Sequence, residues 1–138
     1  MTHDDIIKIT QTAESAVLEF KETTGQLERG METLCAFLNA RGGTVLFGVS
    51  DSGRSDKTKR DIVEAIRRIE PTAPIEISYV SVLNTDKFVV ALKAEELSYL
   101  RPFTYKSRAY QRIESVTTAM PQEMYNQLLM QRGGAYCW

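Results

Sequence analysis

Residues 27–49 read LERGMETLCAFLNARGGTVLFGV, and this stretch decides the fold. Its first half has apolar side chains at spacings of three and four, the pattern of an amphipathic helix over about residues 27–39. These side chains are Leu27, Met31, Leu34 and Leu38. Gly42-Gly43 ends the helix, because glycine readily adopts the left-handed conformation that a helix C-terminus needs. Residues 44–49 are almost wholly apolar, which predicts a strand in the interior of a sheet.

The periodicities elsewhere in the chain predict an α+β domain. The expected elements are a short helix over 4–9, a strand over 16–21, a helix over 59–69, a hairpin of strands 75–82 and 88–93, a strand over 108–113 and a helix from Thr118 to about Met130. The simplest arrangement is a mixed, largely antiparallel β-sheet with helices packed on it. We expect a single domain over 1–138, with its core over about 4–129 and a flexible tail over 131–138.

The composition is that of an ordinary globular domain. Of the 138 residues, 43% are hydrophobic and 25% are charged, which excludes disordered and low-complexity classes. Lysine and arginine number 17 against 18 acids. The resulting net charge of -1 excludes a generally basic nucleic-acid coat but not a basic patch. Neither a membrane-length apolar run nor a signal peptide is visible, so we expect a cytoplasmic protein with no membrane contact.

Cysteine and histidine usage excludes several kinds of site. Cys35 and Cys137 are too few for a disulfide framework, and the apolar surroundings of Cys35 predict a small buried side chain. Because His3 is the only histidine, neither a zinc site nor a Ser-His-Asp triad is expected. The chain has no P-loop pattern, so we do not expect ATP hydrolysis.

Several short motifs resemble those of one known family. They are ES at 14–15 with LEFK at 18–21, CAFLN at 35–39 with GG at 42–43 and FGVSD at 47–51, and YQR at 110–112 with SVTT at 115–118. In this order they are similar to the blocks of the Schlafen/AlbA-like DNA-binding domain family. Its members include bacterial transcriptional regulators and helicase-related proteins, and some bear a divergent ATPase label. The resemblance covers about residues 4–129 and implies binding to DNA or RNA.

The same resemblance implies a carboxylate cluster. Schlafen proteins that cleave RNA use two glutamates and an aspartate in this region, which correspond here to Glu14, Glu19 and Asp51. Such oxygen ligands would hold Mg²⁺ or Mn²⁺ and activate water, and Lys21 would steady a phosphate oxygen. Residues five apart in a regular strand face opposite ways, so Glu14 has to lie in a turn before the strand for the cluster to form. The alternative is a set of solvated surface carboxylates.

A second candidate site combines cations with aromatic rings. Segment 101–112 contains Arg101, Lys106, Arg108 and Arg112, interleaved with Phe103, Tyr105 and Tyr110. Phosphates pair with cations and bases stack on rings, so this pattern is typical of binding to single-stranded or flexible nucleic acid. The helix over 59–69 adds Lys59, Arg60 and Arg67, which would extend the surface if both segments share a face. The alternative is that the rings pack inward and the cations only solubilise the strand.

The turn over 39–43 has two interpretations. Its glycines could cradle a phosphate, but they follow a helix, whereas phosphate loops precede one. We therefore interpret them as a helix C-cap, with Asn39 capping the helix or orienting the loop.

Taken together, the sequence predicts a nucleic-acid-binding domain of a transcriptional regulator. The first alternative is a Mg²⁺- or Mn²⁺-dependent endoribonuclease that uses the Glu14–Glu19–Asp51 cluster, and no cofactor is otherwise expected. The second alternative is a scaffold domain that self-associates, as a homo-oligomer, through an exposed sheet edge.

Overall fold

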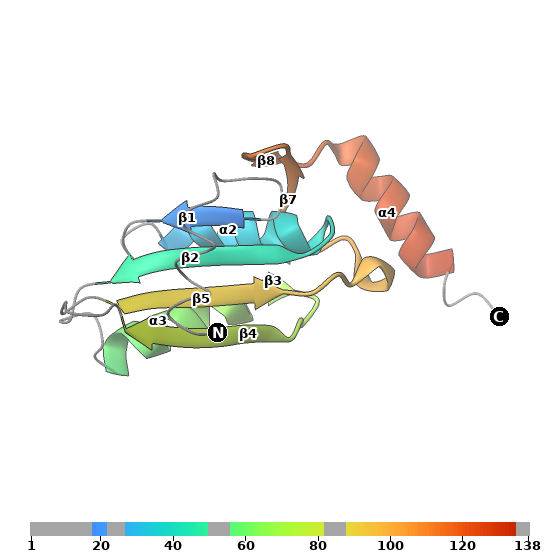
Figure 1. Ribbon diagram of the computed structural model, residues 1–138. Helices are drawn as coiled ribbons and strands as arrows, with labels where there is room; N and C mark the ends of the chain where they lie inside the picture. The colour runs from blue at the N-terminus through green and yellow to red at the C-terminus, as the bar shows by residue number, and fades with distance from the viewer. Residues whose placement is uncertain (1–17, 22–26, 50–55, 82–87, 135–138) are drawn as a thin grey trace.

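A computed structural model describes residues 18–21, 27–49, 56–81 and 88–134, and the helix expected over 4–9 lies outside these ranges. The elements in chain order are β1 (Leu18–Lys21), α2 (Leu27–Leu38), β2 (Gly43–Val49), α3 (Asp56–Arg67), β3 (Ile69–Glu70), β4 (Ile75–Ser81), β5 (Phe88–Ala94), the 3₁₀ helix η3 (Ser98–Leu100), β6 (Thr104–Tyr105), β7 (Arg108–Ile113), β8 (Val116–Ala119) and α4 (Gln122–Gly134) (Figure 1). They form an α+β domain, as predicted.

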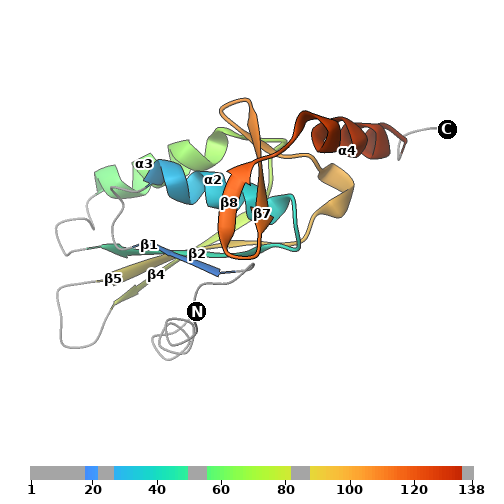
Figure 2. The same cartoon turned by 90° about the horizontal axis from the view of Figure 1, so that it is seen from above.

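The first sheet has the strand order β1-β2-β5-β4. β1 runs parallel to β2, whereas β2–β5 and β5–β4 are antiparallel, so the predicted hairpin of β4 and β5 is confirmed. β2 lies between two neighbours, which confirms that its apolar run forms an interior strand. α2 and α3 lie on the same face of this sheet (Figure 2).

A second, smaller sheet has the order β3-β6-β7-β8. The β7–β8 hairpin crosses α2 (Figure 2), and its strands contact the helix through Thr33–Thr117 and Phe37–Arg112, so α2 packs against both sheets. This position explains why α2 is apolar around most of its circumference, with buried residues from Gly30 through Leu38 that are interrupted only at Glu32.

Some boundaries differ from the sequence prediction, and two short strands were not predicted. Thr118 and Ala119 belong to β8 rather than to the last helix, which begins at Gln122, directly after Pro121. Ile69 lies in β3 and not at the end of the preceding helix. β6 and β8 were not predicted, because their hairpin turns lack the usual glycine or asparagine. Instead, Lys106, Ser107 and Glu114 adopt positive φ angles of 51°, 67° and 53°.

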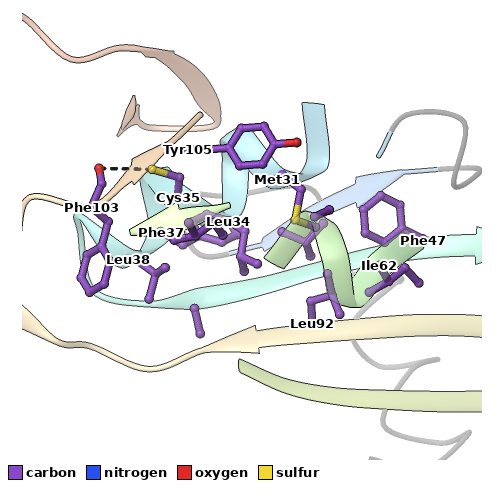
Figure 3. Packing of buried hydrophobic residues seen from close by; sticks show 14 of the residues in the cluster. Met31, Leu34, Cys35, Phe37, Leu38, Phe47, Ile62, Leu92, Phe103 and Tyr105 are labelled. Atoms are coloured by element: carbon purple, nitrogen blue, oxygen red, sulfur yellow. Dashed lines mark hydrogen bonds between the residues drawn. The ribbon is translucent and has the colours of Figure 1, made fainter. Parts of the chain in front are cut away.

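The core forms where α2 meets β2 and β5 (Figure 3). Its largest buried side chains include Met31, Leu34, Phe37, Phe47 and Phe103. The α2–β2 contact is close at Gly30, where an added Cβ atom would lie 2.3 Å from the ring of Phe47. None of the helices in the described ranges is long and apolar enough to cross a membrane.

Candidate nucleic-acid interface

The predicted carboxylate cluster falls largely outside the described residues. Glu19 lies in β1 opposite Val45, and Lys21 lies opposite Phe47, but Glu14 and Asp51 are not among the residues that the structure describes. Within the described ranges, no group of three or more acidic, histidine or cysteine side chains could hold a metal ion. The cluster of Glu14, Glu19 and Asp51 therefore stays a prediction.

The turn after α2 has a structural role, which agrees with the C-cap interpretation. The Gly42 amide donates a hydrogen bond to the Phe37 carbonyl, 2.9 Å away, and Gly42 has a φ angle of +82°. A Cβ atom at Gly42 would lie 2.5 Å from the carbonyl oxygen of Ala94. Glycine is therefore needed here for both conformation and space, and a phosphate is not required to explain it.

Asn39 joins α2 to the segment that leads into the second sheet. Its side-chain amide donates to the carbonyls of Phe103 (3.0 Å) and Tyr110 (2.9 Å). Its side-chain oxygen accepts a hydrogen bond from the Phe103 amide at 2.6 Å. The Cys35 thiol also donates to the Phe103 carbonyl, 3.3 Å away (Figure 3). These buried contacts orient the chain beyond α2 and fix its distance from the helix.

Two of the aromatic rings that were candidates for base stacking pack inward. Phe103 is 0% exposed and Tyr105 is 1% exposed, so neither presents a face to a ligand. Tyr110 is half-buried against the core, and burial is the main cause of a raised pKa for its hydroxyl. The inward alternative is thus correct for Phe103 and Tyr105.

Two arginines of the 101–112 segment are engaged within the protein. The Arg101 guanidinium donates to the Ala40 carbonyl and lies 3.6 Å from a Glu96 carboxylate oxygen. The Arg112 guanidinium lies 5.2 Å from the centre of the Phe37 ring, and its Nη1 donates to the Thr117 hydroxyl at 2.8 Å. Both side chains are half-buried, so they support the position of the second sheet against α2.

Lys106 and Arg108 are the exposed cations of this segment. The Lys106 ammonium donates to both carboxylate oxygens of Glu28, at 2.9 and 2.8 Å. The Tyr105 hydroxyl donates to the same carboxylate at 2.8 Å. Sequence reasoning missed Glu28, because it lies 78 positions before Lys106 and no local pattern links the two.

The predicted cations of α3 are all exposed. Lys59, Arg60 and Arg67 recur along one side of the helix and line an open pocket of about 290 Å³. Val63 and Glu64 complete its lining. A phosphate could therefore approach this side of α3, where the cations outnumber the single acid of the pocket.

The two basic segments meet at the C-terminal end of α3. β3 pairs with β6, with Ile69 opposite Tyr105, and the Lys106 amide donates to the Arg68 carbonyl at 3.3 Å. We call the resulting set of exposed cations the α3–turn surface. It comprises Lys59, Arg60, Arg67, Arg68, Lys106 and Arg108. The β3–β6 pairing thus brings the C-terminal end of α3 next to the turn that carries Lys106, whereas the side chains of Arg101 and Arg112 are half-buried near α2.

A family model described as Schlafen, AlbA_2 matches residues 14–121. The chain belongs to the Schlafen AlbA_2 family. No protein of curated function matches it significantly.

Solved structures share the fold of this Schlafen AlbA_2 domain. One is the N-terminal domain of a RecG-related protein from Nitrosomonas europaea, with a TM-score of 0.58 and 23% identity over 84% of this chain and 91% of that one. Another is the DIP2311 protein from Corynebacterium diphtheriae, with a TM-score of 0.55 and 16% identity over 91% of this chain. This chain spans 30% of the DIP2311 structure.

Proposed function

We propose that this domain binds nucleic acid through the α3–turn surface, in the setting of a transcriptional regulator. The observation that carries the proposal is the contact between Lys106 and Arg68, which joins two basic segments that are far apart in the sequence. Their cations lie at the surface, so they can pair with phosphates without unfolding any part of the core. The family and the RecG-related relative are compatible with a nucleic-acid ligand.

Acidic side chains reduce the positive charge of the α3–turn surface. Glu64 lines the α3 pocket and Glu28 binds Lys106, so part of the positive charge is already neutralised. Nucleic acid would have to compete with Glu28 for Lys106. We therefore expect weak binding that falls steeply as the salt concentration rises.

A filter-binding titration at low salt tests the proposal. The protein should retain labelled single-stranded RNA or DNA, or duplex DNA, and release it as salt is added. No retention of any of these at low salt would contradict the proposal.

The same samples separate binding from metal-dependent cleavage, for which the Glu14–Glu19–Asp51 cluster is the candidate site. If the domain only binds, a structured RNA incubated with Mg²⁺ or Mn²⁺ should stay intact. Cleavage that is abolished in Glu19→Gln would establish the endoribonuclease alternative instead.

A further inference from the structure

Tyr79 is an exposed aromatic ring beside a predicted phosphate-binding cation. It lies on β4, an edge strand of the first sheet, and is 40% exposed. It pairs in register with Val90, a residue of the core that α2 and α3 cover, so the Tyr79 side chain is on the helix-covered face of the sheet. The Lys59 ammonium lies 5.4 Å from the centre of the ring.

Lys59 connects this ring to the α3–turn surface. It contacts Tyr79 on one side and lines the α3 pocket with Arg60 and Arg67 on the other. Val63, in the same pocket, is 42% exposed and adds an apolar surface. The region therefore offers an accessible ring and an aliphatic side chain next to cations. Phe103 and Tyr105 cannot supply such a ring, because both are buried.

We propose that Tyr79 is the base-stacking residue of a single-stranded nucleic-acid site, with phosphates bound by Lys59, Arg60 and Arg67. This inference rests on the proposed function and specifies its ligand. In duplex nucleic acid the flat faces of the bases are already stacked on one another. A protein ring beside backbone-binding cations therefore favours a single strand.

Another exposed tyrosine provides a matched control. Tyr99, on η3, is 62% exposed, which makes it more accessible than Tyr79. The cations near it in the sequence, Lys93 and Arg101, are already paired with Glu95 and Glu96, at 3.9 and 3.6 Å. If exposure alone determined stacking, Tyr99 would be the better site; if adjacent cations are required, Tyr79 is.

The test compares a short single-stranded oligothymidylate with an oligomer of the same length in which abasic residues replace the bases. The wild type should bind the base-containing strand about 5-fold or more tightly, because only that strand can stack. Tyr79→Ala should lower the affinity for the base-containing strand to that for the abasic strand. Tyr79→Phe, which keeps the ring, and Tyr99→Ala should both behave as the wild type.

The outcomes distinguish this inference from the proposed function. If the wild type binds neither strand nor duplex DNA, the proposed function fails. If the wild type binds but Tyr79→Ala keeps its preference for bases, or Tyr99→Ala loses it, the α3–turn surface survives and the stacking role of Tyr79 is wrong. Circular dichroism spectra matching those of the wild type would show that the variants remain folded.

Discussion

The Lys106 ammonium contacts both carboxylate oxygens of Glu28, at 2.9 and 2.8 Å, and thereby holds the β6–β7 turn against the first turn of α2. This hydrogen bond is the main reason that the pKa of Glu28 lies below its ordinary value of 4.5. A carboxylate with a lowered pKa stabilises the fold above the pKa of the unfolded chain. That contribution disappears as the pH falls through the folded pKa.

Glu28→Gln should therefore lower the free energy of unfolding at neutral pH, by about 0.2–1 kcal/mol because the pair is exposed. The difference from the wild type should begin to shrink as the pH falls below 4.5 and should disappear as the pH falls through the lower pKa of Glu28 in the folded protein. Urea unfolding at several pH values measures it. A difference that stays constant across this range would show that the charge of Glu28 contributes nothing to stability.

Gly30→Ala should destabilise the domain. The new Cβ atom would meet the fully buried ring of Phe47 at 2.3 Å, so the ring or the helix must move. Overpacking of this kind costs about 1–3 kcal/mol, which exceeds the roughly 1 kcal/mol that alanine adds in helix propensity. Denaturant unfolding should show the decrease in stability.

The exposed neighbour Arg29 supplies the control for this substitution, since Arg29→Ala should change stability by less than about 0.5 kcal/mol. Combining Gly30→Ala with Phe47→Leu should cost less than the sum of the two single changes, because the smaller side chain makes room. A Gly30→Ala variant as stable as the wild type would contradict the close α2–β2 contact.

Asn39→Ala should lower the free energy of unfolding by more than most substitutions of polar residues do. It leaves the Phe103 amide and the Tyr110 carbonyl without their side-chain partner in a buried region. Each buried polar group left unpaired costs about 1–3 kcal/mol. Asn39→Asp should remain destabilised as well, because a carboxylate can accept from Phe103 but cannot donate to Tyr110.

Thermal unfolding measures the Asn39 variants, with Asn126→Ala as the control. Asn126 is exposed, and its side-chain oxygen accepts an exposed hydrogen bond from Gln122. Its replacement should therefore leave the thermal stability nearly unchanged. Equal effects at the two positions would mean that Asn39 does not fasten the second sheet to α2.

Cys35 should be chemically inert in the folded protein. Its side chain is fully buried, and burial raises the pKa of the thiol to about 12, so almost no thiolate is present at neutral pH. In a Cys137→Ser variant, a thiol reagent should react only as denaturant unfolds the chain. Rapid labelling without denaturant would contradict the buried position of Cys35.

The elements that the sequence predicted well are those with a strong local pattern. The three- and four-residue spacing of 27–38 and the apolar run before Val49 both reflect burial, so α2 and β2 were found. β6 and β8 are short. β6 ends at the turn that contains Lys106 and Ser107, and β8 follows the turn that contains Glu114; lysine, serine and glutamate rarely adopt the positive φ angles seen there. Local propensity favours other conformations there, and packing on α2 overrides it.

The roles of the site residues were harder to predict because they depend on distant partners. Arg101, Lys106 and Arg112 look alike in the sequence. Each of these cations has a different partner on or near α2, and that partner determines whether the cation faces solvent or the protein. Tyr79 was missed for the same reason, since only the fold places it beside Lys59. An exposed aromatic residue in an edge strand is the signal that could have drawn attention to it.

The role of the α3–turn surface in binding is tested most directly by salt dependence. The affinity for a single strand is measured at several salt concentrations, in the wild type and in variants that lack cations of this surface. Arg67→Ala/Arg108→Ala should weaken binding and reduce the slope of log affinity against log salt by roughly 0.7 for each phosphate that is no longer neutralised. Lys93→Ala supplies the control: this exposed cation lies next to core residue Leu92 on β5, so its side chain points to the opposite face of the sheet. Lys93→Ala should keep wild-type affinity and slope. Equal weakening in both variants, or unchanged binding in the double variant, would contradict this role of the α3–turn surface.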